Sequence, residues 1–447
     1  MGERHKAGAD AAYPPERVAW YVIGVLFLLT LFSQLDRQLP ALLVAPIRAE
    51  FRISDTAFSM AQSYAFAFIF TLLGLPLGRL VDRTNRRNLL IAGVVLWSIM
   101  TMLAGLVTGY ASFFATRMGV GIGEAVLTPA AYSLIADYIR PERRGRAIST
   151  FYLSYAIGQG AAFAIGALML RIIPKAGLDL PLLGLQAPWR IAFLLAGMPG
   201  LVLAFLLLTV REPERREVRL ASEMGETIAE DSAIRHVRAN MMAYMPLFAI
   251  PSAMAIVGYT AMNWAPAFFA RRFNLPPTSA GPILGGMMMA AGLFGTLIAG
   301  ALGDRLVRRR VAGARLPLAM VGSAILVPMS LWPLAPQLWM SVTMLGIMMF
   351  GLMLGLASIP AIAQDITPNR MRGQVVAAYA FVAGIIGIAI APTMVALLTD
   401  HVFRNEALVG HSLAVVAFPA ALLGAIACWA GLKPYAQTYD MLHGERA

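Results

Sequence analysis

The chain has 447 residues, of which 59% are hydrophobic and only 13% are charged, and its formal net charge is +12. A single soluble core cannot bury so much apolar surface, so we expect an integral membrane protein with the bilayer as its solvent. The basic residues form short clusters between apolar runs, which argues against nucleic acid as a partner. Cys428 is the single cysteine, so the sequence holds no disulfide framework and no cysteine metal cage.

Twelve apolar runs, each long enough to cross a bilayer, follow one another along the chain. We expect spans near residues 18–46, 57–81, 88–108, 111–138, 145–172, 188–210, 241–271, 278–305, 313–334, 337–367, 372–400 and 408–433. The expected fold class is therefore an all-α membrane protein. Residues 1–17 lack the apolar core of a secretory signal, so the first span is expected to be retained.

One charged motif occurs twice: it reads Gly-Arg-Leu-Val-Asp-Arg-Thr-Asn-Arg-Arg from Gly78 and Gly-Ala-Leu-Gly-Asp-Arg-Leu-Val-Arg-Arg from Gly300, 222 residues later. Such a repeat predicts two related halves and is typical of transporters. We expect two pseudo-symmetric six-helix bundles at 18–210 and 241–433, a linker at 211–240 with a surface helix around Glu217–Arg238, and tails at 1–17 and 434–447.

The distribution of basic residues predicts the orientation in the membrane. Of the 36 Lys and Arg residues, 26 lie in the tails and loops on one side, 8 lie in the opposite loops, and Arg37 and Arg117 lie within spans. Because basic loops stay in the cytoplasm, both termini are expected to be cytoplasmic. Arginine outnumbers lysine 33 to 3, which indicates a GC-rich bacterial gene and an inner membrane. A monomer is expected.

Charged side chains inside spans are candidates for function: Asp36 and Arg37 in the first span, and Arg117 and Glu124 in the fourth. A charge near the bilayer centre costs about 2.5–3.5 kcal/mol, so these residues should face a polar interior, with Arg37 or Arg117 against Glu124 or Asp36. Because guanidinium stays protonated, only Asp36 and Glu124 can change charge, and we predict that they couple transport to protons. The alternative is a static ion network that only fixes the packing.

Prolines interrupt backbone hydrogen bonding beside the same residues. Pro40 leaves the carbonyl of Asp36 without its intrahelical donor, and Pro129 does the same to the carbonyl of Ala125, next to Glu124. We expect these freed carbonyls to face a cavity or a neighbouring side chain.

The second half differs in the groups that it places in the cavity. Asn263, Trp264 and Pro266 occupy the place of Asp36 to Pro40, so we expect interrupted first helices in both halves around a site at the bilayer midplane. The second half is also rich in methionine, and Met348 and Met349 are expected to form a flexible apolar wall.

A polar stripe on the fifth span, formed by Tyr152, Tyr155 and Gln159 at spacing i, i+3 and i+7, is expected to line the path. The cavity would be charged on one side and apolar on the other. It should therefore suit an amphiphile, with the head group toward Arg37 and Arg117 and the tail toward the second half.

The repeated charged motif is expected to form a cytoplasmic gate. Each aspartate ends a span where it could meet the positive N-terminal end of a helix in the opposite half, near Arg372 and near Arg144 respectively. Such contacts would close the cytoplasmic side in the outward-facing state. The predicted gate residues are Asp82, Arg83, Arg86, Arg87, Asp304 and Arg305.

The repeated motif resembles the signature of the major facilitator superfamily. Leu35–Gln38, Gly74–Pro76, Asn85–Leu89 and Arg117–Ala131 further resemble the spinster branch, densely over the first five spans and loosely in the second half. That branch includes exporters of lysophospholipids and sphingosine 1-phosphate. The resemblance implies that Asp36 and Glu124 serve proton coupling and that Arg37 assists the conformational switch.

The predicted function is a proton-coupled secondary transporter that moves an amphiphilic, lipid-like substrate by alternating access without a cofactor. An enzyme or an ATP-driven pump is not expected, because the sequence lacks a P-loop, a His-Glu-x-x-His motif and a Gly-x-Ser-x-Gly motif. Three alternatives stay open: a proton-driven multidrug exporter, a carrier of organic or sugar acids, and a receptor or scaffold built on a transporter fold.

Overall fold

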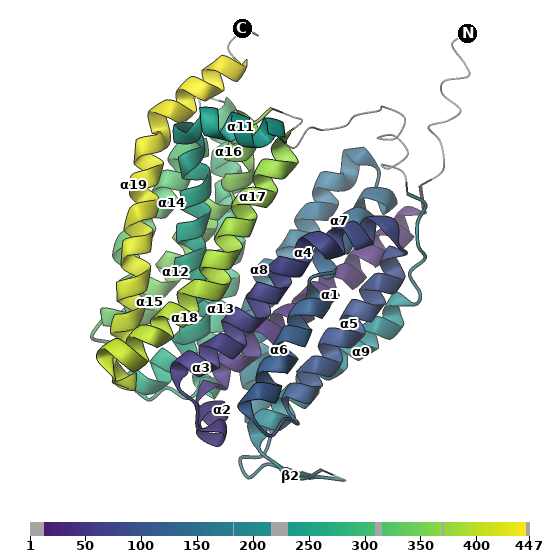
Figure 1. Ribbon diagram of the computed structural model, residues 1–447, viewed down its shortest axis with the longest axis vertical. Helices are drawn as coiled ribbons and strands as arrows, with labels where there is room; N and C mark the ends of the chain where they lie inside the picture. Colours follow the sequence, from purple (N-terminus) through teal and green to yellow (C-terminus); the bar gives the residue numbers. More distant parts are fainter. Residues whose placement is uncertain (1–12, 182, 216–230, 309–314, 369–370, 444–447) are drawn as a thin grey trace.

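The computed structural model describes residues 13–181, 183–215, 231–308, 315–368 and 371–443. Twelve helical segments within these residues are long and apolar enough to cross a membrane, which confirms the expected all-α fold. Six of them precede α11 (Asp231–Ala239) and six follow it, as two separate bundles (Figure 1). Of the expected linker helix the structure describes α11, and residues 216–230 lie outside the described part.

The first bundle contains six spans and two elements that the sequence did not predict. A π-helical turn, η1, lies within the second span, and an antiparallel hairpin of β1 (Leu178–Leu180) and β2 (Gly184–Gln186) follows the fifth. The helices are α1 (Glu16–Leu42), α2 (Val44–Phe51), α3 (Asp55–Ser59), η1 (Met60–Ala65), α4 (Phe66–Arg83), α5 (Arg86–Ala104), α6 (Tyr110–Glu124), α7 (Leu127–Tyr138), α8 (Pro141–Ile172) and α9 (Pro188–Leu207).

The second bundle also contains six spans, and two π-helical turns, η4 and η5, interrupt its fifth span. Its helices are α12 (Met241–Phe273), α13 (Pro277–Arg308), α14 (Arg315–Met329), η2 (Trp332–Leu334), α15 (Leu338–Leu356), α16 (Ile359–Ile366), α17 (Arg372–Gly384), η4 (Ile385–Ile390), α18 (Ala391–Leu397), η5 (Leu398–Phe403), η6 (Glu406–Leu408) and α19 (Val409–His443).

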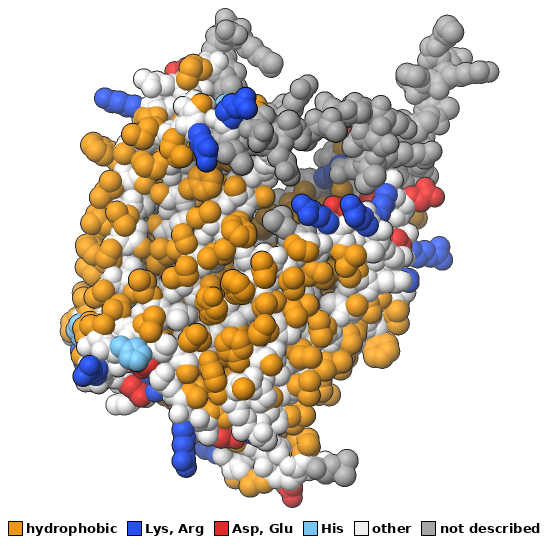
Figure 2. All heavy atoms as spheres, in the orientation of Figure 1, with side chains coloured by type: hydrophobic (Ala, Val, Ile, Leu, Met, Phe, Trp, Pro, Cys, Tyr) orange, Lys and Arg blue, Asp and Glu red, His pale blue; other side chains and the backbone are white. Residues whose placement is uncertain are grey.

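These segments are helical because a backbone in contact with lipid must satisfy its N–H and C=O groups within the segment. Side chains fix where some helices begin. The Ser54 hydroxyl accepts a hydrogen bond from the backbone N–H of Ala57 (3.1 Å), and the Asn85 side chain accepts one from Asn88 (2.9 Å). Apolar side chains cover the middle of the molecule and charged ones gather toward its two ends (Figure 2), as a bilayer requires.

Two boundaries differ from the sequence prediction. The expected interruption of the first helices is present in the first bundle only: α1 passes Pro40, ends at Leu42 and is followed by α2 from Val44. In the second bundle α12 runs through Pro266 without a break, because membrane helices tolerate proline where neighbours satisfy the freed groups. The last helix, α19, continues beyond residue 433 into the predicted tail. The hydroxyl of Tyr435 donates to Asp365 (2.6 Å), which anchors this extension to α16.

The bundles touch along α8 and α13, where glycine permits close contact. A Cβ added to Gly160 would lie 2.5 Å from the carbonyl oxygen of Gly285, and the reverse distance is also 2.5 Å. A Cβ on Gly292 would lie 3.2 Å from the Cβ of Ala156, so the helices are less tightly packed there. Small residues allow such approach of two backbones within a membrane.

The bundles separate at the end of the molecule where residues 13 and 443 lie, called the terminal side below (Figure 1). Figure 2 shows a hollow between the bundles on this side. A Cβ added to Gly78, Gly145, Gly300 or Gly373 would meet no described atom within 4 Å, so these positions have open space beside them in the described part of the chain. At the opposite end, called the far side, the bundles are in contact.

Candidate transport site

The four charged residues expected inside spans come together in the first bundle. The Nε atom of Arg37 lies 2.5 Å from Oε2 of Glu124, a charge-assisted hydrogen bond that joins α1 to α6. Asp36, Arg117 and Glu124 are at most 2% exposed, whereas 15% of the Arg37 side chain is accessible. Within this group, Arg37 is therefore the member that a ligand can reach.

Arg117 satisfies the backbone group that Pro40 leaves free. Its Nη2 atom donates to the carbonyl oxygen of Asp36 over 3.3 Å, so a side chain on α6 takes the place of the missing N–H in α1. This contact is the neighbouring partner that the sequence analysis expected for the freed carbonyl.

The fourth helix of each bundle is interrupted. In the first bundle α6 ends at Glu124 and α7 begins at Leu127. Ala125 lies in this gap, and its carbonyl has no intrahelical donor because Pro129 lacks an N–H. In the second bundle a similar break separates α15 from α16, in which Pro360 is the second residue. Discontinuous helices are typical of sites near the bilayer midplane, and here the break adjoins Glu124.

Several atoms of the charged network have no hydrogen-bond partner within the described part of the chain. They are Oδ1 of Asp36, Oε1 of Glu124, and Nε and Nη1 of Arg117. Buried polar atoms rarely stay unpaired, so these positions are suited to hold water, a proton or a ligand.

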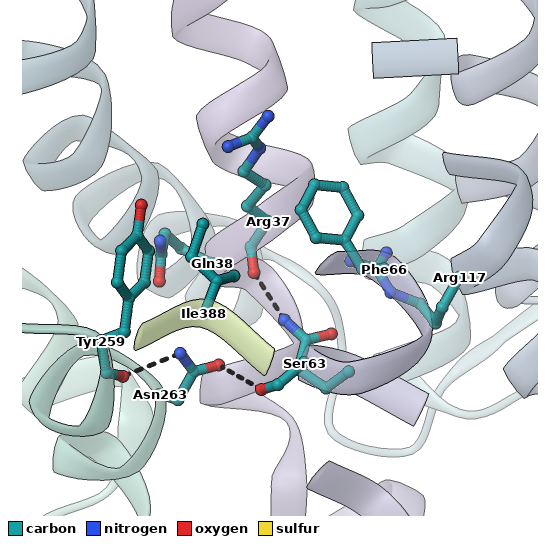
Figure 3. A pocket seen from close by; sticks show the side chains of 9 residues that line it. Arg37, Gln38, Ser63, Phe66, Arg117, Tyr259, Asn263 and Ile388 are labelled. Carbon is teal, nitrogen blue, oxygen red and sulfur yellow. Dashed lines mark hydrogen bonds between the residues drawn. The ribbon is translucent and has the colours of Figure 1, made fainter. Parts of the chain in front are cut away.

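A cavity of about 30 Å³ adjoins the network (Figure 3), and both bundles contribute to its wall. Its volume corresponds to about two water molecules, so it is far too small for a lipid-like molecule. The Arg37 guanidinium lies 4.8 Å from the ring centre of Phe66 and 4.9 Å from that of Phe70, in cation–π contact with both. The lining residues are Arg37, Gln38, Gln62, Ser63, Phe66, Arg117, Tyr259, Asn263 and Ile388.

Asn263 joins the bundles at this cavity (Figure 3). Its side chain accepts a hydrogen bond from the Ser63 hydroxyl (3.4 Å) and donates one to the carbonyl oxygen of Tyr259 (2.9 Å). The neighbouring Gln62 donates to the carbonyl oxygen of Arg37 (2.7 Å). Sequence reasoning missed Gln62 and Ser63, and the signal that marks them in the structure is the π-helical turn η1, a feature frequent at functional sites.

Three predicted cavity residues lie elsewhere. Trp264 is 1% exposed and donates from Nε1 to the carbonyl oxygen of Pro392 (2.9 Å) within the second bundle. Met348 and Met349 are buried in an apolar cluster to which both bundles contribute. The predicted methionine wall is therefore corrected at these two residues: neither borders the 30 Å³ cavity, and their number in the sequence did not indicate which face of the helix they occupy.

The predicted stripe on α8 belongs to an aromatic cluster. Tyr155 and Thr128 share a hydrogen bond of 2.9 Å between α8 and α7. The ring of the exposed Tyr152 lies 6.1 Å from that of Tyr132, a residue that the sequence analysis missed. Gln159 is half-buried, and none of these side chains is among those that line the 30 Å³ cavity.

A cluster of four charges closes the far side, and the sequence analysis did not predict it. Asp55, which is fully buried, accepts two hydrogen bonds from Arg271 of the second bundle (2.6 and 2.7 Å) and lies 3.0 Å from Arg48. Arg48 also donates to both carboxylate oxygens of Glu406 (2.8 Å each). We call Arg48, Asp55, Arg271 and Glu406 the far-side ion cluster, because its bonds cross between the bundles.

Two arginines of the first motif are bound inside the first bundle. Arg86 is 1% exposed and donates to Asp137 of α7 and to Glu212, which follows α9 (2.7 Å). The backbone N–H of Arg87 donates to the same Glu212 carboxylate (2.9 Å). These contacts link parts of one bundle.

The remaining motif residues lie at the open terminal side. Asp82, Arg83 and Arg305 are exposed, and Asp82 forms no ion pair with any described residue. The side chain of Asp304 lies outside the described part of the structure. Because the bundles are apart at this end, the predicted gate contacts belong to a state with the terminal side closed, and they stay a prediction.

Twelve spans in two bundles, with buried charges beside a cavity that both bundles line, define a membrane transporter. The chain belongs to the Major Facilitator Superfamily, whose family model matches residues 26–392. It is accordingly a multi-pass integral membrane protein that acts on a small-molecule substrate and is not an enzyme.

Within the superfamily the chain is similar to spinster proteins and also to transporters with other names. It is 27% identical to an MFS-type efflux pump of Mycolicibacterium smegmatis over 94% of each chain. It is 30% identical to human protein spinster homolog 1 over 56% of this chain, and the match spans 46% of the human protein. It is 23% identical to a probable L-galactonate transporter of Escherichia coli over 89% of each chain.

The fold is similar to that of a bacterial homolog to the human lysosomal transporter Spinster, solved in an inward-facing and unoccupied conformation. The two structures align with a TM-score of 0.75 at 22% sequence identity, over 97% of this chain and 99% of that chain.

Proposed function

We propose that this protein is a proton-coupled transporter that moves an amphiphile with an anionic head group by alternating access. The observation that carries the proposal is the Arg37–Glu124 pair, in which a partly exposed cation is held by an acid with no exposed surface. An arginine in such a position can bind a phosphate or a carboxylate through two parallel hydrogen bonds.

The pair offers a simple mechanism of coupling. A head group that binds Arg37 competes with Glu124 for the guanidinium. A buried carboxylate that has lost its cation carries an uncompensated charge, which costs free energy. Protonation of Glu124 neutralises that charge and removes the cost. Substrate binding and protonation would then favour each other, and loss of the proton would restore the pair and release the substrate. Asp36, whose Oδ1 has no described partner, is the second proposed proton site.

The orientation follows from the basic residues, which gather in the loops of the terminal side. This side is the cytoplasmic one in our proposal, so the described conformation is inward-open, and both termini of a monomer lie inside a bacterial inner membrane. In the outward-facing state Asp82 and Asp304 would close the cytoplasmic side.

The substrate class that we propose is a lysophospholipid or a sphingoid phosphate. Arg37 supplies the site for the phosphate, and the rings of Phe66 and Phe70 beside it supply an apolar surface for the first part of the tail. The small cavity is reserved for water and protons, so the tail would lie in the hollow of the terminal side.

Two other substrate classes have specific support. The relative named as an L-galactonate transporter favours an organic acid, whose carboxylate could bind Arg37 in the same way. The efflux pump of M. smegmatis, similar over nearly the whole chain, favours a drug exporter.

Transport in proteoliposomes with an imposed pH gradient distinguishes these classes. A long-chain lysophospholipid, a hexonate and a lipophilic cation are compared in wild type and in Arg37→Lys, with Arg404→Lys on the far-side surface as the matched control. We expect gradient-driven lysophospholipid transport that falls at least tenfold in Arg37→Lys, because lysine cannot form the paired hydrogen bonds, and is unchanged in the control. Transport of the hexonate or of the cation alone would reject the lipid proposal.

A further inference from the structure

Four buried polar atoms in the interior of the first bundle have no hydrogen-bond partner among the described residues: Oδ1 of Asp36, Nε1 of Trp97, Oγ of Ser98 and Oγ1 of Thr101. Each of these residues is at most 2% exposed. The last three lie on α5, where Trp97 and Ser98 stand four and three residues before Thr101, so each is a neighbour of Thr101 on the helix surface. We call these four residues the polar seam.

Contacts with neighbouring helices define both ends of the seam. At one end the Thr101 hydroxyl lies next to the carboxyl group of Asp36 on α1, without a well-formed hydrogen bond. At the other end a Cβ added to Gly200 on α9 would lie 2.0 Å from the Ser98 hydroxyl and 3.4 Å from Nε1 of Trp97. The missing Cβ at Gly200 thus lets the polar atoms of α5 lie close to the backbone of α9.

Other buried hydroxyls in this bundle behave differently. Thr30 donates to the carbonyl oxygen of Leu26 (2.9 Å), and Thr116 donates to that of Phe113 (2.6 Å), which is the usual arrangement within a helix. Ser98 and Thr101 do not bond in this way, although valine or alanine would avoid the cost of an unpaired buried hydroxyl. Their hydroxyls are available to a further group, and buried water typically bonds to polar groups that are otherwise unpaired.

We propose that the polar seam is an internal hydration site through which Asp36 exchanges its proton, with Thr101 as the residue that positions the carboxyl group. The inference rests on the proposed role of Asp36 in proton coupling. A bound water would give a proton to Oδ1 of Asp36 and take one from the next water, so no charge remains in the seam. The charged groups that face Asp36 are Glu124 and Arg117 of α6 and Arg37 of α1, so α5 contributes the neutral face.

Infrared titration of the full-length protein in lipid nanodiscs tests this proposal without any substrate. The signal is the carboxylic-acid carbonyl band that Asp36→Asn removes. In Thr101→Val we expect its titration midpoint to move to higher pH by about one unit, a tenfold change, because the ionised carboxylate loses the water that the Thr101 hydroxyl would hold beside it. Thr101→Ser should restore the midpoint, and Thr30→Val, an equally buried control, should leave it unchanged.

An unchanged midpoint in Thr101→Val would overturn the proposal, as would a band that does not shift in D₂O, since seam water must exchange its proton. If Thr101→Val does not fold, Thr101→Ala and Ser98→Ala are titrated instead, and an unchanged midpoint in both would reject the seam. Transport assays keep the two proposals apart. A shifted midpoint together with gradient-driven transport in Asp36→Asn would reject the coupling role while the hydration site stands.

Discussion

Arg37 and Arg86 are both largely buried arginines of the first bundle, but their surroundings differ. Arg86 donates to two acids, Asp137 and Glu212, and to the carbonyl oxygen of Pro213 (2.9 Å), so its donors are occupied by its own bundle. Arg37 has one acid and two aromatic rings around it and adjoins a cavity. The first arrangement favours a fixed structural role, and the second leaves donors that a ligand can use.

Replacing Arg86 should destabilise the protein. Arg86→Met removes the cation between Asp137 and Glu212, and breaking a buried ion pair in this way costs about 3–5 kcal/mol. The free energy of unfolding in mixed micelles measures the loss. The exposed Arg83→Met is the control, with a change within about 0.5 kcal/mol. An equal free energy of unfolding for Arg86→Met and Arg83→Met would contradict the structural role of Arg86.

Replacing Glu124 should uncouple transport. Glu124→Gln can still accept a hydrogen bond from Arg37 but cannot change charge, so we expect substrate binding to persist and the response to a pH gradient to be lost. Asp36→Asn should have a similar or milder effect. The ratio of substrate uptake with an imposed pH gradient to uptake without one measures this response, and the exposed Glu142→Gln is the control. Gradient-driven transport in both mutants would remove Asp36 and Glu124 from the coupling step.

The residues that the sequence identified and those that it missed differ in chemistry. Asp36, Arg37, Arg117 and Glu124 were predictable because a charge within a span is costly and must have a reason. Uncharged residues such as Gln62 are tolerated at many positions in a span, so only the structure reveals their contacts.

The helices were predictable as elements, but their faces and local geometry were not. Length and hydropathy determined all twelve spans, because lipid demands about 20 apolar residues with an internally bonded backbone. A helix that is apolar all round, such as α15, has no periodicity that tells which face is buried, so Met348 and Met349 were assigned to the wrong surroundings. The π-helical turns depend on tertiary packing and leave no local signal.

The glycine contact between α8 and α13 should tolerate little added volume. Gly160→Val would place side-chain atoms against the carbonyl oxygen of Gly285, and overpacking of this kind costs about 1–3 kcal/mol. Gly145→Val, on the same helix where space is open, should change the free energy of unfolding by about 0.5 kcal/mol or less. Equal effects on stability would show that the two helices are not held together at Gly160.

The molecule as a whole is closed at one end and open at the other, so mutations at the two ends should act in opposite directions. Asp55→Asn weakens the far-side ion cluster and should favour opening of that side. A cysteine at Ile388, which lines the cavity, reports the change in a background without Cys428. Labelling by an impermeant reagent from the far side should rise several-fold, while the exposed Asp179→Asn should have no effect. Unchanged labelling would show that Asp55 does not help to hold the far side closed.

Asp82→Asn should act on the same reporter from the terminal side. If Asp82 closes this side in the other conformation, its loss should raise labelling of the Ile388 cysteine from the terminal side and lower it from the far side. The exposed Glu142→Asn serves as the control at the same end of the molecule. No change in either direction would indicate that Asp82 only caps its own helix.

The far-side ion cluster has a consequence for the electrical behaviour of the transporter. Arg48 and Arg271 contribute two positive charges, and Asp55 and Glu406 contribute two negative charges. Opening or closing these contacts therefore carries no net charge through the membrane field, which would otherwise contribute about 2.3 kcal/mol per charge and 100 mV. Among the charges described here, those of Asp36, Glu124 and the substrate are then the ones through which we expect membrane voltage to act on transport.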